Sequence, residues 1–239
     1  APRRGAVKDL QSGFYALHSE LAVNGITTAV LAQFYSWEGG MRSPEFAGAF
    51  LEHLEQFAPK VPSTLLPQLR FETHMLDAYK EFAALCTRYA VPYVVFNDHL
   101  PHQALAKGKR PARLTGQALK SGRSPEAHLE LLKELHEKSG QVAAALPDLI
   151  AALGAGVLLG SHDDARAQDR HGWAAKGAAL CEFPETKEAA QAAAALGNPV
   201  IMGAPNVVRG GSQKKNISAL ELVQEGLCSA LASDYHYPS

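Results

Sequence analysis

Short apolar runs alternate along the chain with longer amphipathic segments. Seven of the runs are strand-like, and they fall at residues 26–31, 68–72, 93–96, 157–160, 179–183, 200–203 and 229–233. They are apolar on both faces, as is typical of parallel strands that helices cover. Two of the helix-like segments between them open with Ser-Pro-Glu at Ser43 and Ser124, where serine caps a helix and proline fits its first turn. The pattern therefore predicts repeated strand–helix units.

These units predict an α/β fold, a (β/α)₈ barrel of which about seven strands are visible. Eight strands close such a barrel, so an open doubly wound sheet is the alternative. We expect a single, incomplete barrel domain spanning residues 1–239. Because the chain starts without methionine and stops just after the last run, we expect an internal piece of a longer chain, with one more strand before Ala1.

Chemically capable side chains follow several of the strand-like runs. Glu72, His99, His162 and Asp234 each come at or just after the end of a different run. The carboxyl ends of barrel strands share one rim, so we expect these four residues to converge. Two imidazoles and two carboxylates suit one or two divalent ions, with Zn²⁺ favoured over Mn²⁺ or Fe²⁺. A terminal aspartate such as Asp234 can deprotonate a metal-bound water.

The other histidines are weaker candidates. His74, His102 and His236 lie near the same rim and rank second. The remaining five sit in helix-like segments and are interpreted as surface or packing residues: His18, His53, His128, His136 and His171.

A basic loop with paired glycines follows the sixth run, from Asn206 to Asn216. It contains Arg209, Gly210, Gly211, Ser212, Lys214 and Lys215. Adjacent glycines let backbone amides approach an anion, and arginine binds phosphate oxygens in a two-pronged manner. Such a loop is by itself more often a solvated turn, but beside a metal-binding rim it favours phosphate recognition. A second basic segment, 104–122, is predicted to be loop-like and to be either solvated or folded over the same rim.

Composition and charge exclude some function classes. The net charge is −1 and the isoelectric point is near 6.9, so no general attraction to nucleic acid or acidic membranes is expected. Cys86, Cys181 and Cys228 lack metal-site or disulfide spacing and suit a reducing compartment. No stretch of the sequence resembles a secretory signal, and Pro147 and Asp148 interrupt the longest apolar run. We therefore expect a cytoplasmic protein without a membrane span.

Several of these motifs together resemble the amidohydrolase superfamily, specifically its phosphonate-metabolism branch, which hydrolyses α-D-ribose 1-methylphosphonate 5-triphosphate. The resemblance covers nearly the whole chain and is most specific after Gly156. Its strongest motifs are Ser161-His162-Asp163-Asp164, Glu182-Phe183-Pro184, Met202 to Ser212 and Ala232-Ser233-Asp234-Tyr235. Weaker similarity is found at Arg70-Phe71-Glu72, Asp98-His99 and Gly25 to Thr28.

The resemblance implies a barrel that binds one or two metal ions and releases pyrophosphate from a phosphorylated ribose. Glu72 would be a direct or bridging metal ligand, His99 and His162 imidazole ligands, and Asp234 both a ligand and the general base. Our own inference adds that Arg209 to Ser212, with Asn206, hold the triphosphate. The sequence departs from the superfamily in lacking a His-x-His or His-x-Asp pair near its start and the small β-sandwich formed by both termini.

Two other interpretations remain open. The same barrel can serve cleavage of a cyclic amide or an N-acyl group, in which case Arg209 is unnecessary. Alternatively, the chain is a non-catalytic fragment whose two unpaired strand edges bind another copy and form a homodimer.

Overall fold

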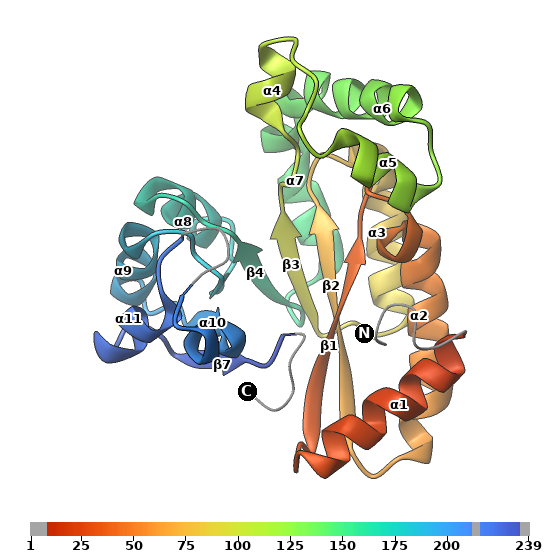
Figure 1. Ribbon diagram of the computed structural model, residues 1–239, viewed down its shortest axis with the longest axis vertical. Helices are drawn as coiled ribbons and strands as arrows, with labels where there is room; N and C mark the ends of the chain where they lie inside the picture. The colour runs from red at the N-terminus through yellow and green to blue at the C-terminus, as the bar shows by residue number, and fades with distance from the viewer. Residues whose placement is uncertain (1–8, 212–215, 235–239) are drawn as a thin grey trace.

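The computed structural model describes residues 9–211 and 216–234, which form a curled, parallel sheet connected and covered by helices (Figure 1). The seven strands are β1 (Thr28–Tyr35), β2 (Thr64–Glu72), β3 (Tyr93–Asn97), β4 (Leu158–His162), β5 (Leu180–Glu182), β6 (Val200–Gly203) and β7 (Ala230–Ala232). All seven predicted strands are confirmed, with β1 running four residues further than its apolar pattern. Each strand pairs in parallel with the next in chain order. The expected incomplete α/β barrel is thus confirmed as a half-barrel whose described edges are β1 and β7.

Helices follow the strands in the strand–helix rhythm that the sequence predicts. Those around β1 to β3 are α1 (Leu10–Val23), α2 (Pro44–Phe57), α3 (Tyr79–Arg88) and α7 (Ser139–Leu153); α8 (Ala167–Ala174), α9 (Lys187–Ala195), α10 (Ala204–Arg209) and α11 (Ala219–Gln224) follow β4 to β6. Three short 3₁₀ helices are η1 (Gly40–Arg42), η2 (Ala58–Lys60) and η3 (Leu76–Ala78). None of the helices in the described ranges is long and apolar enough to cross a bilayer.

The predicted helix caps at the Ser-Pro-Glu motifs are confirmed. Ser43 Oγ accepts a hydrogen bond from Phe46 N at the start of α2, at 3.1 Å. Ser124 Oγ does the same for Ala127 N at the start of α6 (Pro125–Glu137). Each cap satisfies one of the backbone donors that a helix start leaves without a partner.

The core is divided along the sheet. The largest buried cluster joins β1, β2 and β3 to α1, α2, α3 and α7, and its aromatic centre includes Phe71 and Phe82 with ring centroids 4.1 Å apart. A second cluster joins β5 and β6 to α9 and α11. Burial of apolar side chains is the main favourable term in folding. The packing of the helices against the strands therefore holds the strands, and the residues at their ends, in place.

The basic segment 104–122 is helical in large part, so the expected loop is wrong there. Most of α4 (His102–Ala106) and all of α5 (Leu114–Ser121) lie within it. Leu114 and Ala118, one helical turn apart, are fully buried, and Leu114 packs in one cluster with Leu132 of α6. The helices α4, α5 and α6 lie beyond the carboxyl ends of β1 to β3 (Figure 1).

Replacing Ala90 with glycine is expected to raise the free energy of unfolding by up to about 1 kcal/mol. Ala90 is exposed and follows the end of α3 with φ 45°, a left-handed conformation that costs about 1–2 kcal/mol for a residue with a Cβ. Denaturant unfolding measures the change.

The matched control is Gly122→Ala, at the end of α5. Gly122 has φ 69°, and a Cβ there would meet no atom within 4 Å, so the substitution changes only backbone strain. It should lower stability by a similar amount, and a stability gain in this variant would contradict the argument.

Candidate metal and phosphate site

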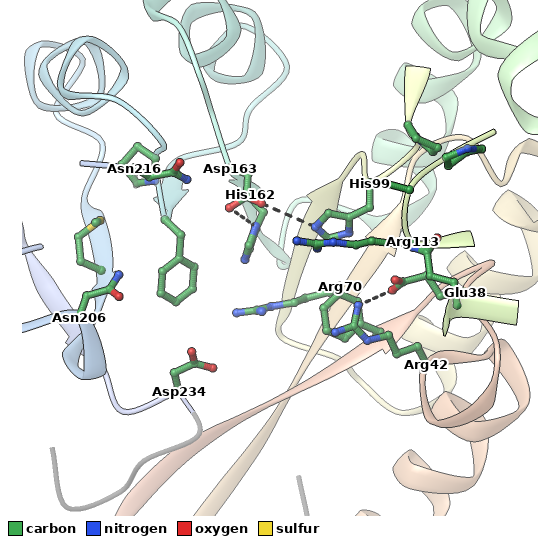
Figure 2. Close-up of a pocket in the computed structure, with 18 of the residues that line it drawn as sticks. Glu38, Arg42, Arg70, His99, Arg113, His162, Asp163, Asn206, Asn216 and Asp234 are labelled. Atoms are coloured by element: carbon green, nitrogen blue, oxygen red, sulfur yellow. Dashed lines mark hydrogen bonds and ion pairs between the residues drawn. The ribbon is translucent and has the colours of Figure 1, made fainter. Parts of the chain in front are cut away.

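A pocket of about 820 Å³ lies where the carboxyl ends of the strands meet the segment after β3. His99, His162, Asp234, Asn206 and Arg209 all line it, although they come from four different parts of the chain. Figure 2 labels the first four of them. The volume is in the usual range for a small-molecule site, about 300–1,000 Å³. The structure thus brings together five of the residues that the sequence singles out.

Glu72 lies behind His99 and is fully buried at the end of β2. Its Oε2 accepts a hydrogen bond from the His99 backbone N–H at 3.0 Å, and its Oε1 lies 2.6 Å from His99 Nδ1. Both carboxylate oxygens therefore hold His99, which leaves Nε2 as the ring nitrogen that faces Asp163, 3.8 Å from Oδ2. A carboxylate that fixes the ring of a metal-binding histidine in this way is a common arrangement.

The His99 ring has a strongly altered proton affinity. Burial disfavours its charged form, but the carboxylates of Asp163 and Glu72 outweigh that effect and raise the pKa of His99 to about 10. Without an ion, the His99 ring is therefore protonated at both nitrogens and lies between two carboxylates. A cation at Nε2 can take the place of the proton there.

His99, His162 and Asp163 form a group able to hold a metal ion, with one ligand atom from each lying within 4.8 Å of the others. His162 Nδ1 is buried and has no hydrogen-bond partner among the described residues, although Asp163 Oδ1 is 3.0 Å away. A buried ring nitrogen without a hydrogen bond is costly unless something binds it. Two imidazoles and a carboxylate fit the donor set expected for a zinc-like ion.

Three residues at the pocket have a left-handed backbone that side chains rarely adopt. Asp163, Phe183 and Asp234 follow β4, β5 and β7 with φ values of 60°, 53° and 52°, and all three line the pocket. Aspartate tolerates this conformation, whereas at Phe183 it stores about 1–3 kcal/mol of strain, and such strain is concentrated at functional sites. Figure 2 shows the Asp234 carboxylate across the pocket from His162 and Asp163.

Four arginines line the same pocket, namely Arg42, Arg70, Arg113 and Arg209. Arg42 forms an ion pair with Glu38, and its guanidinium lies 4.1 Å from the centre of the Phe34 ring. Arg113 also points into the pocket in Figure 2. Arginines gathered in this way provide paired donors for phosphate or carboxylate oxygens.

Glu182, a rim residue without an assigned role in the sequence, holds one of these arginines. Its carboxylate is buried and accepts hydrogen bonds from Gln68 and Tyr93 at 2.6 Å and from Arg70 Nη2 at 3.0 Å. Burial, with Glu182 alongside, raises the pKa of the Tyr93 hydroxyl, which therefore stays protonated and donates. The position of Arg70 is thus set before any ligand binds.

The glycine loop after β6 differs from its expected form. Residues Asn206 to Arg209 belong to α10, and Gly210 ends this helix with φ 76°. Gly210 and Gly211 are not among the residues that line the pocket, and Ser212 lies outside the described residues, as does His236. The loop expected from Asn206 is therefore wrong for its first four residues, because Pro205 and the apolar pair after it continue the chain as a helix.

Sequence reasoning missed several residues of the pocket. Asp163 directly follows His162, and Arg70 lies two residues before Glu72, so their closeness in the sequence to predicted site residues was the available signal. Arg113 stands within the basic segment. Arg42 and Glu38 follow β1 and carry no recognisable pattern.

Comparison with known proteins bears on the family of the chain, not on the arrangement of the site residues. No family model matches the chain. The chain is 33% identical over 242 aligned positions to alpha-D-ribose 1-methylphosphonate 5-triphosphate diphosphatase of Escherichia coli (strain K12). The alignment covers 93% of this chain and 60% of that protein, so the chain spans less than two thirds of its relative's length. The resemblance to a phosphonate-metabolism diphosphatase is thereby confirmed.

Proposed function

We propose that the protein is a metal-dependent hydrolase that converts α-D-ribose 1-methylphosphonate 5-triphosphate to the 5-phosphate and pyrophosphate. The observation that carries this proposal is one pocket containing four arginines beside a group of His99, His162 and Asp163. A triphosphate needs several cations, and its hydrolysis needs an activated water. The activity named for the relative in Escherichia coli supports this substrate.

His99 through Nε2, His162 through Nδ1 and the Asp163 carboxylate would hold the ion, with Zn²⁺ preferred and Mn²⁺ or Fe²⁺ as alternatives. Such an ion lowers the pKa of bound water and stabilises charge on a phosphoryl oxygen. Glu72 holds His99 in the required orientation and tautomer. Asp234, across the pocket, accepts the proton of the attacking water.

The arginines would hold the departing phosphates. Arg70 is fixed by Glu182, and Arg42 by Glu38 and Phe34, so both bind without much loss of side-chain freedom. Arg113, directly before α5, and Arg209 and Asn206 of α10 line the same pocket. Pyrophosphate would therefore leave from the arginine side of the pocket.

The experiment is pyrophosphate release from this triphosphate by the 239-residue chain, stripped with a chelator and then supplied with Zn²⁺, Mn²⁺ or Fe²⁺. We expect activity only after an ion is restored. Full activity of the metal-free chain would contradict the proposal. No release under any condition, together with no binding of pyrophosphate by calorimetry, would favour the non-catalytic fragment.

Replacing Arg113 with alanine is expected to weaken pyrophosphate binding by about 10- to 100-fold, because a hydrogen bond to a charged group contributes about 1.5–3 kcal/mol. Arg110→Ala is the matched control, since Arg110 lies in the same basic segment but outside the pocket, 3.5 Å from Glu126. Calorimetric titration measures both. Equal losses in the two variants would indicate general attraction by charge, and turnover of a cyclic amide unaffected by Arg113→Ala or Arg209→Ala would favour the amide-cleaving alternative.

A further inference from the structure

A second group of potential metal ligands lies near the ends of β2 and β3 and comprises His74, Asp98 and His102. One ligand atom from each residue lies within 4.8 Å of the others. His102 Nε2 is 3.0 Å from both Asp98 oxygens, and His74 Nδ1 is 3.5 Å from Asp98 Oδ1. None of the three is among the residues that line the pocket. The adjacent residues Asp98 and His99 thus belong to two different groups.

The burial of the group is uneven in a way that suits an ion. His74 is only 6% exposed, whereas Asp98 and His102 are accessible at the surface. The His74 ring also packs against the His102 ring, with centroids 4.8 Å apart. One ligand is therefore held in place by the protein interior, and the other two leave a path from solvent.

His136, at the end of α6, supports the ring of His102 from behind. The two Nδ1 atoms are 2.8 Å apart, a hydrogen-bond distance, and the ring centroids are 5.0 Å apart. One of the two nitrogens must donate and the other accept. When His102 donates through Nδ1 to His136, an ion at Nε2 takes the place of the proton that Nε2 otherwise donates to Asp98. Metal-binding histidines regularly donate their other ring N–H in this manner.

We propose that His74, Asp98 and His102 form a second binding site for a divalent transition metal, separate from the pocket, with His136 as the residue that positions His102. Two imidazoles and one carboxylate are a ligand set for Zn²⁺ that leaves a fourth position for water. The site joins the ends of β2 and β3 to the start of α4.

A simple ion pair is the competing explanation. Asp98 and His102 are four residues apart and partly exposed, and exposed ion pairs contribute little to stability. An ion pair explains the positions of Asp98 and His102. It does not explain why the buried His74 ring faces the same Asp98 carboxylate, or why His136 contacts His102. The only other contact found at His74 Nδ1 in the described ranges is Thr73 Oγ1 at 3.4 Å.

The site would also stiffen one wall of the pocket. His102 begins α4, and its neighbours Pro101 and Ala104 line the pocket. An ion that holds His102 against His74 therefore limits movement of this wall. The second site is in this sense structural, and it needs no role in the chemistry proposed for the pocket.

The test uses the 239-residue chain, stripped with a chelator and equilibrated with Zn²⁺ alone, and counts bound zinc after gel filtration. We expect one equivalent fewer in His102→Ala than in the unaltered chain. His171→Ala should retain the full amount, because His171 is exposed on α8 and bonded to the Ala167 carbonyl. His102→Ala with unchanged zinc content and affinity would overturn the proposal.

A parallel measurement on His162→Ala separates this site from the proposed function. Loss of one equivalent in each variant supports both sites. Loss in His102→Ala but not in His162→Ala supports the second site and counts against metal in the pocket. Loss only in His162→Ala overturns the second site. Thermal unfolding monitored by circular dichroism shows that each variant is folded.

The positioning role of His136 is tested separately, by the zinc affinity of two variants. His136→Ala should weaken zinc affinity at the second site by about 10- to 100-fold, the usual effect of removing a residue that supports a ligand. His136→Gln should restore most of that affinity, since an amide oxygen can accept from His102 Nδ1. In the His162→Ala background, the visible absorption of bound Co²⁺ monitors the second site alone. Equal affinities in all three proteins would contradict the positioning role.

Discussion

Asp234→Asn is expected to lower kcat for pyrophosphate release by about 10²- to 10⁴-fold, the usual contribution of a general base, with little change in KM. Asparagine has the same shape but cannot accept the proton of the attacking water. It also tolerates the left-handed backbone at this position, where φ is 52°, so the local fold should persist. Steady-state kinetics on the triphosphate measure both constants.

The pattern of loss decides the role of Asp234. A base acts in the transition state, so its removal lowers kcat and kcat/KM together. A rise in KM with kcat unchanged would instead make Asp234 a residue that only binds substrate. Unaltered pyrophosphate binding by Asp234→Asn, measured by calorimetry, is the corresponding control for an intact pocket.

Arg170→Met is expected to lower the free energy of unfolding by about 3–5 kcal/mol, because it leaves a buried charge without its partner. Arg170 on α8 is fully buried, and its Nη1 lies 3.3 Å from Asp164 Oδ2 and 2.9 Å from Ser161 Oγ. Asp164 also accepts from Ser161 Oγ at 2.7 Å. Chemical denaturation measures the loss.

Two further variants make this prediction specific. Arg166→Met removes an exposed ion pair with Asp169 at the start of the same helix and should cost no more than about 1 kcal/mol. The double variant Asp164→Leu with Arg170→Met should regain part of the stability, since no unpaired charge remains. Equal losses for Arg166→Met and Arg170→Met would show that burial of the pair is unimportant.

The strands were predictable because their apolar residues are consecutive in the chain. Even the three-residue strands β5 and β7 fall within apolar runs, and the parallel order follows from helices lying between them. The helix α5 was missed for a related reason. Its buried positions, Leu114 and Ala118, are few and lie among basic and small residues, so the helical period is weak in the sequence.

The sequence predicts a site residue correctly only where the residue reaches the pocket because it follows a strand. His99, His162 and Asp234 reach one pocket because each follows a strand, while the metal and base roles assigned to them stay predictions. The role of Glu72, in contrast, cannot be predicted from its position at a strand end. Its place at a strand end is as expected, but whether its oxygens bind an ion or His99 depends on a contact between residues 27 apart.

The arginines depend even more on contacts between distant residues. Arg70 is directed by Glu182, which lies 112 residues away in the chain, and no local pattern contains that information. Likewise, His136 lies in a helix-like segment, which predicts a surface or packing residue. Its proximity to His102 follows from how α6 packs beside α4, which is a tertiary property.

The left-handed residues after β4, β5 and β7 restrict how this pocket can evolve. At Asp163 and Asp234 the backbone accepts glycine, asparagine or aspartate readily and other residues only with strain. Phe183 is the exception, and its ring, 5.1 Å from His162 and 5.6 Å from Arg70, offsets the cost of its backbone. A saturation library at these three positions should therefore retain few functional members. Changes in substrate preference are expected to accumulate on α4, α5 and α10 instead, where the chain has no such backbone restriction.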